Sequence, residues 1–292
     1  MARGVGTSAR SGAGATMRDL VSTRDLKVGH MIFEFATPGI GHICKAAGCD
    51  FLILDLEHTG FSYETLKIML RGTEAAGLPN VVRVPSKEYH HIARACDAGA
   101  EGLMLPMVND AREAEGIIQC MKYHPRGQRG VGLGLAHDLY RSGPVMEKLA
   151  AANEKTTLFA QIETAAGVRN ADEIAAIDGV DCLWIGHFDL STSLGIPGDF
   201  AHKKFTDAIE KVRRACEKHD KAYGRLVPSV EEGIRLNSEG FDFICYWGDV
   251  WAYQAHITDA IQAIRDGEAG AASKAAGSKA PAKAKGGRKK SK

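Results

Sequence analysis

The stretch DCLWIGHFDLS, residues 181–191, joins an apolar run to polar side chains. Residues 182–185 are apolar without alternation, which is typical of a parallel strand that is covered on both faces. Gly186 interrupts the run, and His187 and Asp189 follow it. The stretch therefore predicts an α/β fold in which a buried strand delivers a carboxylate at its end.

Strand-like and helix-like runs alternate on both sides of this stretch. Eight strand-like runs alternating with helical segments predict a (β/α)₈ TIM barrel. A doubly wound sheet is the weaker alternative, because no Gly-x-Gly-x-x-Gly motif follows the first run. We expect the strands at residues 30–36, 51–56, 80–84, 102–106, 157–163, 181–186, 222–226 and 242–247.

One connection is longer than the others. Residues 107–156, after the fourth expected strand, take twice the usual length and contain the Gly- and Arg-rich stretch HPRGQRGVGLGLAHDLY. Loops of this length in a compact domain are usually functional or disordered. We interpret this long loop as an active-site flap or a contact between subunits.

The two ends of the chain differ from its middle. Residues 1–20 are expected to form a flexible extension, with Met17 as a candidate alternative start, and residues 21–267 the catalytic barrel domain. Residues 268–292 are rich in Ala, Gly and Lys and contain no large apolar residue. Such a segment cannot offset the entropy of ordering, so we expect a disordered tail.

The charge is distributed unevenly. The net charge is +1, but residues 270–292 contain eight Lys or Arg and no acidic residue, which leaves 29 basic and 36 acidic residues elsewhere. A mildly acidic body does not favour a nucleic-acid partner. Docking of a non-catalytic barrel on a polyanion through the basic tail remains an alternative.

The cysteines and the apolar runs indicate the cellular compartment. The seven cysteines form no C-x-x-C pair, so neither a zinc site nor a disulfide framework is predicted. No apolar run has the length of a membrane span, and the N-terminus lacks the apolar core of a secretory signal. We expect a cytoplasmic protein with no membrane partner.

Polar side chains follow several of the expected strands, at the barrel end where catalysis takes place. Each of them alone also has a structural explanation, such as a helix cap for a carboxylate. The candidates are Glu57, His58, Arg83, Gln161, Glu163, His187, Asp189, Tyr246, Trp247 and Asp249.

Glu163 and Asp189 are the most informative pair. They end neighbouring strands, so their carboxylates can converge, and two adjacent carboxylates repel unless they are protonated or bridged by a cation. Because no nearby His or Cys ligand pattern accompanies them, the pair indicates a hard ion such as Mg²⁺ or Mn²⁺. Two protein ligands would leave positions for water and a chelating substrate.

The order of the motifs resembles the HpcH/HpaI family, class II pyruvate aldolases on a (β/α)₈ barrel of the phosphoenolpyruvate/pyruvate type. The resemblance spans most of residues 28–250, and its motifs are specific only in combination. They are DLEH (55–58), RVP (83–85), DAGAEGLMLPMV (97–108), HPRGQRGVG (124–132), QIET (161–164) and GVD, IG and DLS within 179–191.

The resemblance implies a role for each matching residue. Glu163 and Asp189 would bind a divalent cation (Mg²⁺, Mn²⁺ or Co²⁺) that chelates pyruvate. Arg83 would stabilise the enolate, and His58 would belong to the acid–base system. The resemblance also implies a homo-oligomer, a trimer or a hexamer.

Two further matches concern Gln161 and Asp97. Gln161 would lie near the pyruvate, and Asp97 matches the aspartate that pairs with the family's histidine. Because Asp97 precedes its strand, it should lie at the opposite end of the barrel. It would then serve a site across a subunit boundary, or its role would be structural.

The sequence departs from the family after the sixth strand. Where the family commonly has Gly-Pro-Ala before the aspartate, this chain has Gly186, His187 and Phe188 before Asp189. Either the Phe188 ring turns outward, or it reshapes the substrate pocket. Trp247 is a second candidate for apolar substrate contact near this mouth; the alternative is a core or interface position.

The leading functional hypothesis is an aldehyde-lyase that cleaves a 4-hydroxy-2-oxo acid to pyruvate and an aldehyde through a metal-bound enolate. A Schiff-base aldolase would need a buried Lys at a strand end, and none of the expected strand ends has one. The alternatives on the same barrel are a lyase acting on a CoA thioester and an oxaloacetate decarboxylase.

Overall fold

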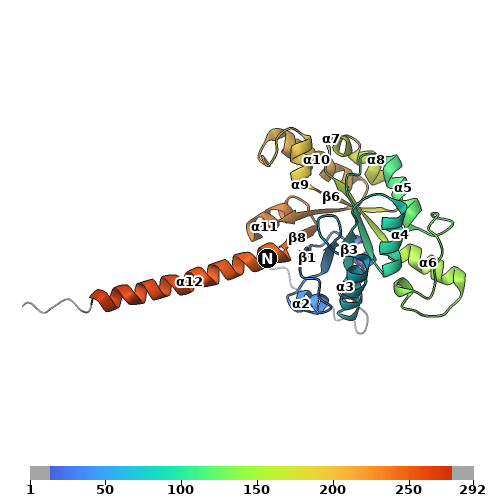
Figure 1. Cartoon of the computed structure of the whole chain (residues 1–292). Helices are drawn as coiled ribbons and strands as arrows, with labels where there is room; N and C mark the ends of the chain where they lie inside the picture. Colours follow the sequence, from blue (N-terminus) through green and yellow to red (C-terminus); the bar gives the residue numbers. More distant parts are fainter. Residues whose placement is uncertain (1–13, 278–292) are drawn as a thin grey trace, which may run out of the picture. The chain divides into compact units, whose positions relative to one another are not determined.

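A computed structural model describes residues 14–277, and its strands form a closed parallel barrel in sequence order (Figure 1). β8 pairs with β1, which closes the barrel. The predicted (β/α)₈ TIM barrel is therefore confirmed. The strands are β1 (Lys27–Ile32), β2 (Phe51–Asp55), β3 (Asn80–Arg83), β4 (Gly102–Leu105), β5 (Thr157–Ile162), β6 (Val180–Ile185), β7 (Ala222–Val227) and β8 (Phe243–Gly248).

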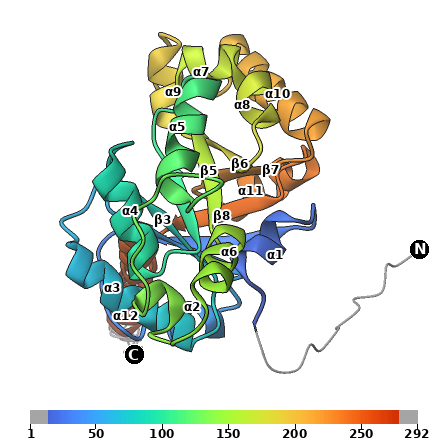
Figure 2. The same ribbon diagram turned by 90° about the vertical axis from the view of Figure 1, so that its right-hand side faces the viewer.

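Helices alternate with the strands and surround them (Figure 2). Several begin at a side chain that accepts a backbone N–H of the first turn, as Ser62 does from Thr65 and Asp110 does from Glu113. The helices are α1 (Met17–Val21), α2 (Ile40–Ala46), α3 (Tyr63–Ala75), α4 (Tyr89–Ala98), α5 (Ala111–Met121), α6 (Val145–Lys155), α7 (Ala165–Arg169), α8 (Ala171–Ala176), α9 (His187–Ser193), α10 (Lys203–Lys218), α11 (Val230–Ser238) and α12 (Asp249–Gly277), with a short 3₁₀ helix η1 (Ala136–Asp138).

The strands separate two apolar clusters. In β6, Cys182 and Trp184 belong to a cluster inside the barrel, whereas Leu183 and Ile185 belong to a cluster that includes the surrounding helices. Successive side chains of a strand point to opposite faces. Both faces of β6 are thus apolar, which accounts for the continuous apolar run in the sequence.

The first strand begins and ends earlier than the sequence pattern predicts. We expected residues 30–36, but β1 ends at Ile32. The next three backbone N–H groups, of residues 33–35, donate to the carboxylate of Asp249 at 2.9, 3.0 and 2.7 Å. Because these donors serve a side chain, they cannot continue the ladder with a neighbouring strand.

The N-terminal segment differs from the expected flexible extension of residues 1–20. Residues 1–13 lie outside the described part, but Met17 begins a helix, and it and Val21 are buried in the cluster inside the barrel. The guanidinium of Arg18 also forms an ion pair with Asp181. Residues 17–21 form a helix whose side chains Met17 and Val21 pack inside the barrel.

The long connection after β4 contains α5, η1 and α6, and its irregular part lies between α5 and α6. Arg71 of α3 donates to the carbonyl of Ala136 at 3.1 Å. The N–H of Gly130 donates to the hydroxyl of Tyr89, the first residue of α4, at 2.8 Å. The expected roles as an active-site flap and as a contact between subunits both stay predictions.

The compact unit that contains the barrel ends at Val250, and Trp251 begins a second unit. The second unit continues α12 as far as Gly277, ten residues into the expected disordered tail of 268–292. The alanines of this segment favour a helix, and residues 278–292 lie outside the described part. Among the described helices, none is both long and apolar enough to span a bilayer.

Candidate active site at the strand exits

Arg83 and Asp55 form the centre of the site. They end the neighbouring strands β3 and β2 in paired register, and Arg83 Nε donates to Asp55 Oδ1 at 2.7 Å. Asp55 is fully buried and also accepts the backbone N–H groups of Glu57 and His58 at 3.0 and 3.1 Å. The sequence analysis missed Asp55, although it begins the DLEH motif, because its pattern fitted the end of a strand.

Glu57 links Arg83 to His58. Its Oε2 lies 3.3 Å from Arg83 Nε and 3.6 Å from His58 Nε2. Burial raises the pKa of Glu57, with Asp189 also raising it, while Arg83 and His58 act in the opposite direction. The His58 side chain is 61% exposed, so its imidazole is accessible to a substrate.

Glu163 lies beyond the end of β5 and is almost completely buried. Its Oε1 accepts the backbone N–H of Met107 at 2.6 Å, and its Oε2 accepts the amide N–H of Gln161. The pKa of Glu163 is raised to about 7, and burial is the largest cause. The charges of Glu57 and Asp189 also raise it, whereas the two hydrogen bonds lower it.

Met107 is a second contributor that the sequence analysis missed. It follows β4 and adopts a φ of 54°, in the left-handed region that side-chain-bearing residues seldom occupy. In this conformation the backbone N–H of Met107 points at Glu163 and donates to it. A backbone donor carries no mark in the sequence, so only the structure assigns Met107 to the site.

Gly186 leaves room for the Glu163 carboxylate. A Cβ on Gly186 would lie 2.1 Å from Glu163 Oε2, so no side chain fits there. Asp189 follows in the first turn of α9, and its charge raises the pKa values of Glu163 and Glu57. The charge of Asp189 thus acts on Glu163, and the expected convergence of the two carboxylates stays a prediction.

The aromatic candidates are Phe188 in α9, after β6, and Trp247 in β8. The Phe188 side chain is 64% exposed, and its ring lies 4.6 Å from that of His187 and 5.3 Å from that of Phe200. Burial and the nearby Arg225 lower the pKa of His187 to about 3, so this imidazole remains neutral. Trp247 is half-buried with a φ of 49°, and its roles as contact or core residue both remain predictions.

Asp97 lies apart from the groups at the strand exits. It is near the end of α4, before β4 begins, and its carboxylate pairs with the buried guanidinium of Arg129. Arg129 in turn lies over the Tyr123 ring at 4.5 Å. Within one subunit this geometry gives Asp97 a structural contact and no contact with His58.

The donor set at the strand exits fits a cation. Asp55, Glu57 and Glu163 lie near one guanidinium, Arg83, and the charge of Asp189 acts on Glu57 and Glu163. Gln161 Oε1 is buried without a hydrogen-bond partner in the described structure. The described side chains form no group of three or more His, Cys, Asp or Glu arranged around one metal position. Glu163 and Asp189 stay the candidate pair of ligands.

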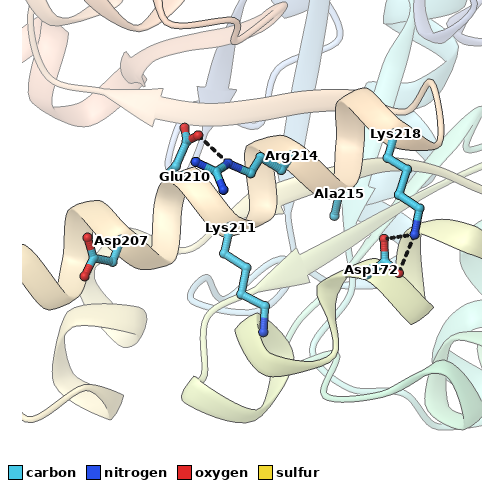
Figure 3. A pocket seen from close by; sticks show the side chains of 7 residues that line it. All are labelled: Asp172, Asp207, Glu210, Lys211, Arg214, Ala215 and Lys218. Carbon is cyan, nitrogen blue, oxygen red and sulfur yellow. Dashed lines mark hydrogen bonds and ion pairs between the residues drawn. The ribbon is translucent and has the colours of Figure 1, made fainter.

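A separate pocket of about 490 Å³ lies between α8 and α10 (Figure 3). Lys218 pairs with Asp172 at 2.9 Å across it, and Arg214 pairs with Glu210 at 2.7 Å. Its charges neutralise one another, and no strand exit lines it. The strand-exit cluster, not this pocket, is the candidate active site.

Comparison with known proteins identifies the family of the chain. The HpcH/HpaI aldolase/citrate lyase family matches residues 31–247, which include every strand exit of the site. The chain belongs to this family. The predicted resemblance is thereby confirmed, and the family indicates an aldolase or related lyase.

Relatives within the HpcH/HpaI family are similar over most of the barrel. A hydroxypyruvate/pyruvate aldolase of Chromohalobacter salexigens is 36% identical over 216 residues, which are 74% of this chain and 85% of that protein. A 5-keto-4-deoxy-D-glucarate aldolase of Shigella boydii is 33% identical over 209 residues, or 72% and 80%. The crystal structure of an HpcH/HpaI aldolase from Desulfitobacterium hafniense superposes with a TM-score of 0.81 at 30% identity, covering 86% of this chain and 96% of that one.

Proposed function

We propose that the protein is a divalent-metal-dependent aldolase that cleaves a 4-hydroxy-2-oxo acid to pyruvate and an aldehyde. The observation that carries this proposal is the gathering of carboxylates at the strand exits. Asp55, Glu57 and Glu163 lie near Arg83, and the charge of Asp189 acts on Glu57 and Glu163. Glu163 and Asp189 would hold Mg²⁺, Mn²⁺ or Co²⁺. When bound there, such an ion would polarise the keto group of the substrate.

Arg83 would stabilise the charge that develops on cleavage. Breaking the bond β to the ketone leaves an enolate, and a fixed cation beside its oxygen lowers the barrier. The Asp55 carboxylate holds Arg83 through Nε. The guanidinium is therefore positioned before substrate binds, with its terminal amino groups as donors toward the substrate.

His58 would accept the proton of the 4-hydroxyl group. An imidazole titrates near neutral pH and is suited to this transfer. The backbone N–H of His58 is fixed by Asp55, and Nε2 lies 3.6 Å from Glu57. Glu57 would thus orient the imidazole and stabilise its protonated form.

The relatives bear on the substrate class. The names hydroxypyruvate/pyruvate aldolase and 5-keto-4-deoxy-D-glucarate aldolase support a 2-oxo acid as one reaction partner. Decarboxylation of oxaloacetate passes through the same enolate, so we expect it as a side activity that needs Arg83. Phe188, Gln161 and Trp247 are our candidates for substrate contact.

We also propose that the enzyme is a homo-oligomer. The proposal that Asp97 serves a neighbouring subunit's site depends on such an assembly. Its ion pair with Arg129 supports the alternative structural role. Mixing Asp97→Asn subunits with His58→Ala subunits distinguishes the role in a shared site from the structural role. Recovery of activity in the mixture requires a site shared between subunits.

The first experiment is a substrate screen. The purified full-length protein would be incubated with pyruvate or hydroxypyruvate and a panel of aldehydes, in Mg²⁺, Mn²⁺ or Co²⁺, and adduct formation followed by mass spectrometry. We expect condensation with at least one aldehyde. Activity toward a CoA thioester with none toward any aldehyde would contradict the proposal.

A further inference from the structure

Cys44 and Cys49 are the first and last residues of a helix-ending motif. The N–H of Gly48 donates to the carbonyl of Lys45 at 3.0 Å, and the N–H of Cys49 donates to that of Cys44 at 3.0 Å. Gly48 has a φ of 93°, the left-handed conformation that this Schellman motif needs. A contact between the side chains of the first and last residues frequently accompanies this motif.

Both of these side chains are thiols, and Cys49 packs against the apolar cluster that contains Cys44. Cys44 is buried and Cys49 is half-buried. Interaction with the Cys44 thiol lowers the pKa of Cys49, and the same interaction raises that of Cys44. The more accessible sulfur is therefore also the one that ionises first, which is the arrangement of a reactive thiol beside a resolving thiol.

The same motif elsewhere in the chain provides an internal comparison. Within residues 14–277 the same two-bond pattern ends α3, α4, α9, α10 and α11. None of these copies joins two thiols. Their first and last residues are Thr73 and Leu78, Ala95 and Ala100, Ser191 and Ile196, Cys216 and Lys221, and Leu236 and Phe241.

We propose that Cys44 and Cys49 are a site of reversible oxidation, at which a hydroperoxide converts the two thiols into an intrachain disulfide. The Cys49 thiolate would attack the peroxide, break its O–O bond and become a sulfenic acid. Cys44 would then attack that sulfur and displace its oxygen as water. With hydrogen peroxide, two thiols and one peroxide give one disulfide and two waters.

The site is independent of the proposed aldolase chemistry. Cys49 precedes β2, which begins at Phe51, so the pair lies at the end of the barrel where strands begin. The aldolase candidates follow the strands at the opposite end. A failure of either proposal therefore leaves the other untouched.

Peptide mapping tests the disulfide directly. Trypsin cleaves after Lys45, so Cys44 and Cys49 fall in separate peptides, residues 28–45 and 46–67, each with one cysteine. After treatment of the full-length protein with hydrogen peroxide, we expect one linked species, two hydrogens lighter than the sum of the two peptides. A thiol reductant should release both peptides.

Three variants sharpen the test. Cys44→Ser should leave a sulfenic acid on Cys49 that dimedone traps, and Cys49→Ser should abolish the link. Cys216→Ser changes a thiol at the equivalent motif position and should leave the link unchanged. Cys120, a half-buried thiol outside the motif, should remain reduced in the unmodified protein.

The wild-type map alone decides the outcome if a variant fails to fold. The proposal would be overturned by oxidation of Cys49 to sulfinic acid while Cys44 stays a free thiol. Equal rates of oxidation at Cys120 and Cys49 would also overturn it. So would a link found only between two chains, which a non-reducing denaturing gel shows as a covalent dimer.

Discussion

Arg83 and Asp55 stand in paired register at the ends of two neighbouring strands, joined by a 2.7 Å hydrogen bond from Nε to Oδ1. The same carboxylate receives the backbone N–H groups of Glu57 and His58. One buried aspartate thus holds the Arg83 guanidinium and the backbone that carries Glu57 and His58. Positioning before binding is what allows such groups to act on a transition state.

Asp55→Asn should weaken both the fold and the activity. The substitution removes a charged acceptor from Arg83 inside the protein, and hydrogen bonds to charged groups contribute about 1.5–3 kcal/mol. We expect a loss of about that size in the free energy of unfolding, measured by urea denaturation. The control is Asp50→Asn, whose exposed carboxylate accepts one N–H at 2.9 Å, and it should cost less. Equal stability of Asp55→Asn and wild type would contradict the anchoring role.

Arg83→Lys should impair every reaction that passes through the enolate. Lysine keeps the charge but loses the planar fork and the Nε donor. Removing one such electrostatic contact typically costs about 10²–10³ in kcat. We expect comparable losses in aldol cleavage and oxaloacetate decarboxylation, with no loss in the exposed control Arg214→Lys. Unchanged decarboxylation in Arg83→Lys would remove this residue from the enolate step.

His58→Ala should separate the two reactions. A positioned acid–base group contributes about 10²–10⁴-fold, and only aldol cleavage requires removal of a hydroxyl proton. The ratio of aldolase to decarboxylase activity should therefore fall. If both activities fall equally, His58 acts on the metal site or the fold instead.

The metal-free protein should lose stability as the pH rises. The pKa of Glu163 is about 7 in the folded state against 4.5 for the free group, so the native state holds a proton that the unfolded chain has released between these values. The free energy of unfolding should then decrease as the pH rises through this window, because the unfolded state binds fewer protons there. Thermal midpoints in EDTA would measure this, and Glu163→Gln should flatten the dependence. An equally steep dependence in Glu163→Gln would assign it to other groups.

Met17→Ala should destabilise the barrel from its interior. Met17 is fully buried in the cluster inside the strands, and truncating such a side chain costs about 2–5 kcal/mol. Met146→Ala, at a side chain that is 70% exposed, is the matched control. Urea denaturation of both variants gives the comparison. Similar stabilities would show that the N-terminal helix is dispensable.

Much of the barrel could be predicted because its strands are buried on both faces. An apolar run such as that of β6 is visible without homologues, and the order of strands then places Glu163 beside Asp189. The sequence could not show that Met17 fills the barrel interior, because one short helix has no periodic pattern. It also could not show why β1 ends at Ile32, since Asp249 lies more than two hundred residues away.

The finer parts of the site depend on contacts that leave no local pattern. Asp55 fits the end of a strand as well as it fits an anchor for Arg83. The N–H of Met107 reaches Glu163 from another strand exit, 56 residues distant in sequence. Asp97 matches a motif, yet its partner in the subunit is Arg129, 32 residues later.

Metal dependence of pyruvate release tests the central claim most directly. Protein treated with EDTA would be assayed on a 4-hydroxy-2-oxo acid, with pyruvate followed continuously, before and after addition of Mg²⁺, Mn²⁺ or Co²⁺. We predict that EDTA abolishes release, that an added ion restores it, and that neither Glu163→Ala nor Asp189→Ala is restored. Full activity of either variant in chelator, or a pyruvate adduct trapped on a lysine by borohydride, would contradict the proposed function.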